Sequence, residues 1–287
     1  MSKIAIVTDT NSGITIDQAK EMGIHLIAMP FMINKEEFYE GINLSKSEFY
    51  QRLEDSADIK TSQPSPEDTM NLWDELLKEH ESVVYIPMSS GLSSSCHNAV
   101  MLANEYEGKV FVVDNQRISV TQLHSVLDAL KMREQGLNAK DIKQKLEDTK
   151  FESSIYITLD TLYYLKKGGR ITPAAAAIGT VLKLKPVLQI QGEKLDAFAK
   201  ARTMTQAKSL MINAIKNDIE KRFGGLEQKK IWLAIAHTEN EEAAQVLKEE
   251  LSKEIPDCEI YVDHLPLSIA CHIGPGSLAI ACCKEVV

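Results

Sequence analysis

Short apolar runs alternate with amphipathic segments through most of the chain, and this alternation limits the fold more than any other feature of the sequence. The segments between the runs, such as residues 45–56 and 65–80, have helical periodicity. Four runs have the length and β-branched content of buried strands: KIAIVT (3–8), IHLIAM (24–29), SVVYIP (82–87) and KVFVVD (109–114). The pattern predicts an α/β fold whose first sheet is mainly parallel, with crossover helices.

The length of 287 residues suits two domains. Residues 118–150 are helical in pattern, broken at EQGLNAKD, and SSIYITLD restarts the strands near residue 153. We therefore expect an N-terminal α/β domain over 1–152 and a C-terminal α/β domain over 153–287, with a ligand between them. The second domain is predicted as a strand, two helices, strands KPVLQI and AFAKA, a helix from Thr203 to Phe223, strand IWLAIAH, a helix over 239–252, strand EIYVD and a glycine-rich ending.

Composition excludes several classes of protein. The N-terminus lacks the apolar core of a signal peptide and no stretch is long enough to span a bilayer, so we expect a cytoplasmic protein. The five cysteines, at 96, 258, 271, 282 and 283, have no CxxC spacing, which predicts neither a disulfide nor a metal site. A formal net charge of −9 argues against nucleic-acid binding.

Positive charge is nevertheless concentrated in one segment. From Lys166 to Lys208 there are nine Lys or Arg residues, and the only acidic residues are Glu193 and Asp196. Such a segment suits an anionic ligand or partner.

The stretch PMSSGLSSSCHNA (87–99) runs from a strand into a helix whose pattern buries Cys96, Ala99, Val100 and Ala103. Three interpretations compete for its serines. They cap the helix, they bind a carboxylate or phosphate at its N-terminus, or Ser93 is the nucleophile of a degenerate hydrolase elbow. The third needs a distant base, for which the candidates are His237, His264 and His272.

Three further stretches bear on this choice. KTSQPS (60–65) holds Thr61 and Ser62 in a proline-restricted loop, which is either a turn or a second set of hydroxyl donors. LKKGGRITP (165–173) ends one helix and starts an alanine-rich one, and its Arg170 is either solvated or a dock for phosphate. HIGPG (272–276) places His272 in stiff backbone, as an anion donor or as an ordinary buried histidine.

Together these stretches resemble the DegV family, also seen as the fatty-acid-binding subunits of bacterial fatty acid kinase. The matching pieces follow the family order over almost the whole chain: IVTDT, YEG, KTSQPS, SSGLSSS, VVDN, LKKGGRI, LKLKPVL and HIGPG. The resemblance implies two α/β domains that enclose a long-chain fatty acid in an apolar tunnel at their interface. It implies a lipid-binding protein, at most the substrate-binding subunit of an enzyme, with no cofactor.

The resemblance also implies roles for individual residues. Thr61 and Ser93 would hydrogen-bond the carboxylate, with Ser62, the backbone near Ser94 and His272 nearby. Arg170 and Arg202 would engage a separate ATP-dependent kinase and its phosphoryl group, which makes acyl-phosphate for phospholipid metabolism. The absence of a Walker A motif and of a dinucleotide glycine fingerprint fits ATP binding elsewhere. A transient contact with a membrane surface fits a lipid transport role.

This chain departs from the family pattern at three positions. Ser94 stands where the family commonly has glycine, Glu40 where it has aspartate, and Thr10 where it has serine. These changes bear on the details of the head-group contacts. A serine hydrolase that acts on acyl esters through Ser93, and a carrier or sensor for another amphipathic acid, are the alternatives.

Overall fold

The computed structural model describes residues 3–170, 172–174, 184–192, 194–226, 231–256 and 258–286. Its contacts divide the chain into two compact units. Unit 1 comprises Met1–Lys150, Pro266–Ser268 and Val286–Val287, and unit 2 comprises Phe151–Leu265 and Ile269–Glu285. Within the described ranges, none of the helices combines the length and the apolar character that a bilayer crossing needs.

The main sheet of unit 1 is parallel throughout. Its strands, in the spatial order β2-β1-β6-β7, are His25–Ile27, Ile4–Asp9, Ser82–Ile86 and Val110–Val112. All six residues of β1 are buried, because helices cover both faces of the sheet. The α/β fold and the parallel first sheet predicted from the apolar runs are confirmed.

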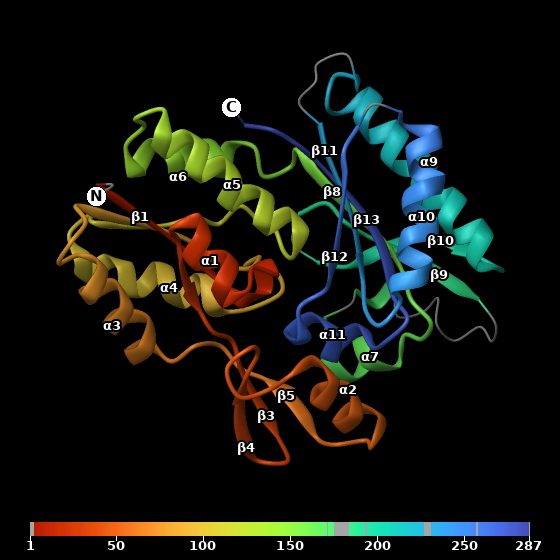
Figure 1. Ribbon diagram of the computed structural model, residues 1–287, viewed down its shortest axis with the longest axis horizontal. Coiled ribbons are helices and arrows are strands. Elements are labelled where there is room, and N and C mark those ends of the chain that lie inside the picture. The colour runs from red at the N-terminus through yellow and green to blue at the C-terminus, as the bar shows by residue number, and fades with distance from the viewer. Residues whose placement is uncertain are drawn as a thin grey trace. The chain divides into compact units, whose positions relative to one another are not determined.

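Two pairs of helices pack on opposite faces of this sheet (Figure 1). On one face, Trp73 of α3 and Cys96 of α4 lie in a core with Val7 and Tyr85. On the other, Gln122 of α5 reaches Thr8. The helices of unit 1 are α1 (Ile16–Met22), α2 (Lys46–Glu54), α3 (Pro66–Leu76), α4 (Ser95–Ala103), α5 (Val120–Glu134) and α6 (Ala139–Asp148), with 3-10 turns η1 (Thr10–Ser12) and η2 (Asn104–Tyr106).

Unit 1 also contains an antiparallel sheet, β4-β3-β5, that the sequence did not predict. Its strands are Glu36–Tyr39, Pro30–Ile33 and Ile59–Thr61. β5 has only three residues, too few for a periodic pattern, and is defined by its pairing with β3, in which Thr61 lies opposite Phe31. Thr61 therefore ends a strand, where a loop had been expected.

Unit 2 is built on a six-stranded mixed sheet, in the order β10-β9-β8-β13-β11-β12. Among the described residues of this sheet, only β11 and β12 pair in parallel. The strands are β8 (Ser153–Thr158), β9 (Lys185–Ile190), β10 (Asp196–Ala201), β11 (Ile231–His237), β12 (Ile260–His264) and β13 (Leu278–Lys284). The helices in the described part of unit 2 are α7 (Tyr163–Gly168), α9 (Met204–Lys221) and α10 (Glu241–Glu254), and α11 (Leu267–Ile273) begins in unit 1 and continues in unit 2.

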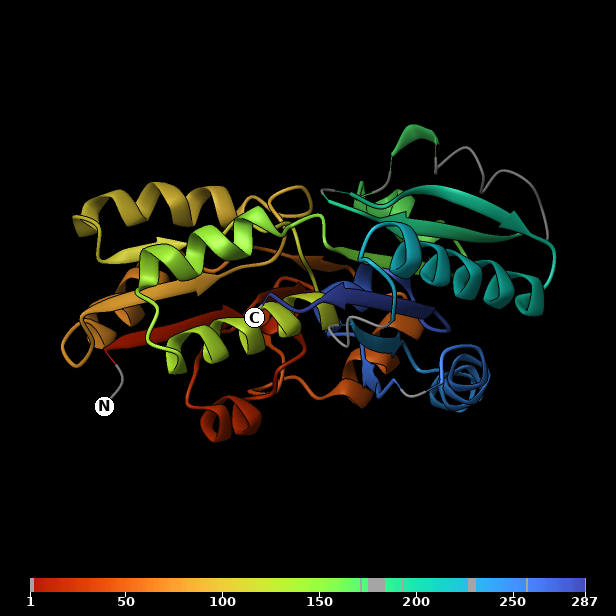
Figure 2. The same ribbon diagram turned by 90° about the horizontal axis from the view of Figure 1, so that it is seen from above.

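Helices α9 and α10 lie on one face of the unit 2 sheet (Figure 2), and their apolar stripes are buried there. Met211 and Ile215 of α9 and Leu247 of α10 are fully buried there, together with Ile235 and Ile280 from the sheet. Burying a side chain of this size stabilises the fold by about 1.5–3 kcal/mol.

Strand β13 lies in the middle of the sheet, where the sequence predicted only a glycine-rich ending. Its residues LAIACC are all apolar and lack alternation, and such a run does not distinguish a strand from a buried helix. The alanine-rich helix predicted after Pro173 lies largely, from residue 175 to 183, outside the described residues.

Candidate functional site

The turn between β6 and α4 carries Ser93 and Ser94. The Ser93 N–H donates to the carbonyl of Ser89 (3.1 Å), and its Oγ accepts from the N–H of Ser95 (3.2 Å). Ser94 is exposed at the N-cap and its side chain makes no capping bond. The serines therefore stand at a helix N-terminus beyond the carboxyl end of a parallel strand, as predicted, and the Ser93 hydroxyl accepts from the first N–H of the helix.

The helix buries a narrower face than the sequence suggested. Cys96 and Ala99 are buried, but Val100 is 42% exposed. The prediction that Val100 belongs to the buried face was wrong, because the stripe of α4 that meets the sheet runs through Cys96 and Ala99.

Ser93 lacks the backbone strain of a nucleophile elbow. Its φ is not positive, whereas such an elbow holds its serine in a sharp, strained turn. Two of the proposed bases also have both ring nitrogens engaged. His237 contacts the Glu241 carboxylate (2.9 Å) and the Asn240 N–H (3.2 Å), and His264 contacts the Leu265 carbonyl (2.8 Å) and the Glu239 N–H (3.2 Å). This arrangement favours ligand binding over nucleophilic attack.

A buried carboxylate holds the start of this turn. Asp9, at the end of β1, accepts from the Met88 N–H (2.9 Å) through Oδ2 and from Gln122 Nε2 (3.0 Å) and the Asn11 N–H (3.0 Å) through Oδ1. Burial raises the pKa of Asp9, although these donors lower it. This function of Asp9 was not predicted, and its one sign in the sequence is a charged residue that ends a buried, largely apolar strand.

The loop after β5 approaches the same helix. The Ser62 N–H donates to the carbonyl of Pro30 (3.1 Å), and Asn98 of α4 donates to the side-chain oxygen of Gln63 (2.7 Å). Thr61 is half-buried and Ser62 is exposed. Two hydroxyl-bearing segments of unit 1 are thus joined by a hydrogen bond between their neighbours.

In unit 2, the candidate Arg202 lies at the end of the sheet where β8 ends and β9 begins. Antiparallel pairing puts the end of β8, the start of β9 and the end of β10 at this end, with Thr158 opposite Val187 and Lys185 opposite Ala201. Arg202 follows β10 directly and is exposed. Lys185 pairs with Asp160, which follows β8 (2.6 Å).

Arg170 stands beyond α7 and is also exposed. Its guanidinium donates to the carbonyl of Gly168. Its charge is the second of two causes that lower the pKa of His272 to about 4, the first being burial. His272 is therefore neutral at neutral pH and acts there as a hydrogen-bonding group and not as a cation.

Glycines in two motifs make room for the side chains around His272. A Cβ added at Gly168 would collide with Nδ1 of His272, and one added at Gly274 would collide with the ring of Tyr164. Gly274 also has φ +76, in the left-handed region that favours glycine. LKKGG and HIGPG are therefore two halves of one packing arrangement.

The seven candidate residues fall into two groups. Thr61, Ser62, Ser93 and Ser94 belong to unit 1, and Arg170, Arg202 and His272 belong to unit 2. Among the described residues, no three His, Cys, Asp or Glu side chains converge as they would around a metal ion. The five cysteines are free thiols.

Glu40 has a defined partner in unit 1. Its Oε2 accepts from the N–H of Leu267 (3.0 Å), the first residue of α11. The longer side chain at this position thus holds a helix start, where N–H groups lack partners within the helix.

Comparison with known proteins gives a consistent match. The model described as "Uncharacterised protein, DegV family" matches residues 3–285. Protein DegV of Bacillus subtilis (strain 168) is 30% identical over 283 residues, covering 98% of this chain and 99% of that protein.

Solved structures agree in sequence and in fold. A DegV family protein of Thermus thermophilus, described as binding fatty acid, has 30% identity and a TM-score of 0.89, over 98% of this chain and 99% of its own. DegV of Bacillus subtilis, described as a fatty acid binding protein, has 29% identity and a TM-score of 0.87, over 99% and 100%. By sequence and by fold, this chain belongs to the DegV family.

Proposed function

We propose that this protein binds a long-chain fatty acid, such as palmitate, and holds its carboxylate with Thr61 and Ser93. Ser62, the backbone near Ser94 and His272 lie nearby in this proposal. The observation that carries it is the bond from Asn98 to Gln63, which joins the loop after β5 to the helix that begins beyond Ser93. The relatives described as fatty-acid-binding, at 29% and 30% identity over nearly the whole chain, support the choice of ligand.

The position of the hydroxyls suits an anionic head group. Hydroxyls and N–H groups at the start of α4, beyond the end of a parallel strand, favour negative charge through the helix dipole. Hydrogen bonds to a charged group contribute about 1.5–3 kcal/mol each, roughly twice a neutral one. Two such bonds would select an acid over an uncharged lipid of the same length.

The acyl chain must be shielded from water. A sixteen-carbon chain has about fourteen CH2 groups, and at about 0.8 kcal/mol each their burial stabilises the complex by about 11 kcal/mol gross. Ordering the chain offsets part of this gain, and a bilayer offers the acyl chain similar burial. We therefore propose an apolar tunnel between the two domains, 1–152 and 153–287, and a transient contact with membranes for loading.

We further propose that the bound acid is presented, in the cytoplasm, to a separate ATP-dependent fatty acid kinase. That enzyme would move the γ-phosphoryl group of ATP to a carboxylate oxygen, releasing ADP and forming acyl-phosphate for phospholipid metabolism. The exposed guanidinium groups of Arg170 and Arg202 suit contact with the kinase or with the transferred phosphoryl group.

The ligand itself provides the first test. Native mass spectrometry of the purified protein, followed by solvent extraction, should release one long-chain acid per chain. A protein that stays empty when long-chain acids are supplied would contradict the proposal. Extraction of another amphipathic acid would instead identify a different carrier.

A further inference from the structure

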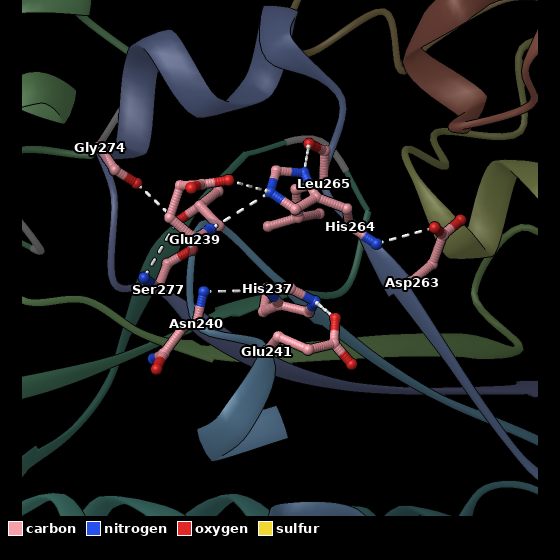
Figure 3. Close-up of polar contacts among 10 residues, drawn as sticks. His237, Glu239, Asn240, Glu241, Asp263, His264, Leu265, Gly274 and Ser277 are labelled. Atoms are coloured by element: carbon pink, nitrogen blue, oxygen red, sulfur yellow. Dashed lines mark hydrogen bonds and ion pairs between the residues drawn. The ribbon is translucent and has the colours of Figure 1, made fainter. Parts of the chain in front are cut away.

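A short segment of unit 2, Thr238–Asn240, forms several hydrogen bonds with the turn that follows His272. The Thr238 hydroxyl donates to the carbonyl of Gly274 (2.7 Å) and accepts from the Ser277 N–H (3.0 Å). The Gly276 N–H donates to the Thr238 carbonyl (2.7 Å), and Asn240 Nδ2 donates to the Gly276 carbonyl (3.1 Å). Figure 3 shows the contacts that this segment, in the loop after β11, makes with Gly274 and Ser277, which precede β13.

The hydrogen bonds of the Thr238 hydroxyl with this turn are buried, and they depend on the hydroxyl group. Thr238 is fully buried, and its hydroxyl both donates and accepts within the turn. Removing a buried partner leaves the other group unsatisfied, which costs about 1–3 kcal/mol. The Thr238 hydroxyl therefore fixes the turn more firmly than a packing contact of the same size would.

Two histidines accept hydrogen bonds from the backbone of segment Thr238–Asn240 and stabilise its conformation. The Glu239 N–H donates to Nε2 of His264 (3.2 Å), and the Asn240 N–H donates to Nδ1 of His237 (3.2 Å). Glu239 has φ +44, an unusual conformation for a residue with a side chain, so the segment needs such support. An imidazole nitrogen accepts only when it carries no proton, and both rings are therefore neutral in this arrangement.

The other ring nitrogens agree with this assignment. Nδ1 of His264 lies 2.8 Å from the carbonyl of Leu265 and so carries the proton. Nε2 of His237 lies 2.9 Å from the Glu241 carboxylate and carries its proton there. Figure 3 shows each imidazole between a backbone partner and a carboxylate.

Protonation of His264 would change these contacts. Its Nε2 also lies 3.1 Å from the Glu239 carboxylate, so a proton on Nε2 favours the carboxylate and displaces the Glu239 N–H. The charged groups around the ring are Glu239, Glu241 and Asp263, whose Oδ1 accepts from the His264 N–H, and the ring of His237 lies 5.0 Å away. The Glu239 carboxylate is thus the partner that a protonated ring would meet.

We infer that Thr238 and His264 are positioning residues. They hold the Gly274–Ser277 turn, and through it His272, in the geometry that meets the ligand carboxylate. Protonation of His264 exchanges the hydrogen bond from the Glu239 N–H for a contact with the Glu239 carboxylate, and so frees the backbone of the segment. The inference rests on the proposed function, since His272 matters to this argument only if a carboxylate binds near it.

The first experiment compares Thr238→Val with Thr205→Val, a matched change at an exposed position of α9. Amide hydrogen exchange of the ligand-free protein should show Ser277 exchanging at least tenfold faster in Thr238→Val alone. The ratio of affinities for palmitic acid and hexadecanol should fall about fivefold in the same variant, since one hydrogen bond contributes about 1 kcal/mol. A general loss of stability would weaken the acid and the alcohol equally.

The outcomes separate the two proposals. Unchanged exchange at Ser277 would show that the Thr238 hydroxyl does not stabilise the turn. Faster exchange with an unchanged affinity ratio would overturn the positioning role. Fatty acid binding stands in both cases. A wild-type protein that binds neither acid nor alcohol overturns the proposed function, and the positioning role with it.

The second experiment uses pH. Between pH 7.5 and 5.5, the acid-to-alcohol ratio of the wild type should fall more than that of His264→Gln, whose side-chain oxygen accepts from the Glu239 N–H without titrating. The ligand's own titration is common to both proteins and cancels in the comparison. Identical pH profiles would overturn the role of His264.

Discussion

The two groups of candidate residues differ in how they are held. In unit 1, Thr61 and Ser93 are short side chains on backbone fixed by a strand ladder and a turn. In unit 2, Arg170, beyond α7, and Arg202, directly after β10, are long and exposed cations. Short hydroxyls on fixed backbone suit a ligand atom at one exact distance, whereas long cations suit a mobile or transient partner.

Each unit also has an ionisable group with a shifted pKa: the buried Asp9, which supports the turn of Ser93 in unit 1, and His272, a half-buried candidate residue, in unit 2. Burial is the largest cause of both pKa shifts, raising that of Asp9 and lowering that of His272. Both shifts favour the uncharged form. The exposed arginines have no such support, so the two groups should respond differently to mutation and to pH.

The largest expected effect separates the hydroxyls from the arginines. The double change Thr61→Ala and Ser93→Ala should weaken fatty acid binding about 100-fold, because two hydrogen bonds to a charged group of about 1.5 kcal/mol each are lost. Titration calorimetry or ligand fluorescence would measure it.

The control for this comparison is the double change Arg170→Gln and Arg202→Gln. Affinity for the acid should stay within about threefold, while phosphorylation of the bound acid by a fatty acid kinase should be lost. Equal effects of the two double variants on acid affinity would remove the distinction between the groups.

Acid should destabilise unit 2 through His272. Its pKa is about 4 when folded and 6.5 when free, so the folded form binds fewer protons below pH 6.5 and loses stability as the pH falls toward 4. Between pH 7 and pH 5 this amounts to about 2 kcal/mol. Urea unfolding of the wild type and of His272→Gln at both pH values would measure it.

Two histidines serve as comparisons for that experiment. His97→Gln changes an exposed side chain and should keep the full acid sensitivity of the wild type. His124 is buried in unit 1 and its pKa is lowered to about 3, chiefly by burial, so it should add acid sensitivity to unit 1. An acid sensitivity of unit 2 that persists in His272→Gln would show that another group carries it.

Replacing Asp9 should loosen the turn of Ser93. In Asp9→Asn one carboxylate oxygen becomes an NH2 group, which places a donor against the Met88 N–H or against Gln122. We expect unit 1 to lose about 1–2 kcal/mol of stability, with weaker acid binding. Asp17→Asn, at an exposed position of α1, is the matched control, and equal loss in both variants would refute this role of Asp9.

The candidate hydroxyls could be found in the sequence because local patterns mark them. Serines after an apolar run predict a helix start at one sheet edge, and β1, β2, β6 and β7 were readable as apolar runs. The short β5 and the all-apolar β13 could not be predicted as strands from local patterns, since only their pairing with other strands defines them.

The supporting contacts could not be predicted for a related reason. Asp9 meets Met88 across 79 residues of chain and Gln122 across 113, and Thr238 meets Gly274 across 36. Local periodicity contains no information at such separations. Only the assembled sheets bring these residues together, and a charged or polar residue at a strand end is their one local sign.

The smallest expected effect concerns Ser94, where the family commonly has glycine. Its φ of −73 and ψ of −7 lie in the right-handed region open to any residue, so no glycine is needed for the backbone. Its side chain is exposed and makes no capping bond, so Ser94→Gly removes little. We expect acid affinity to change less than about threefold, within about 0.5 kcal/mol. Ser94→Ala is the control for loss of the hydroxyl alone. If glycine strengthened binding tenfold and alanine did not, the bound state would need a backbone conformation at residue 94 that serine restricts. The backbone that carries the unit 1 hydroxyls would then have to move on binding, and the contrast with unit 2 would no longer rest on a fixed backbone.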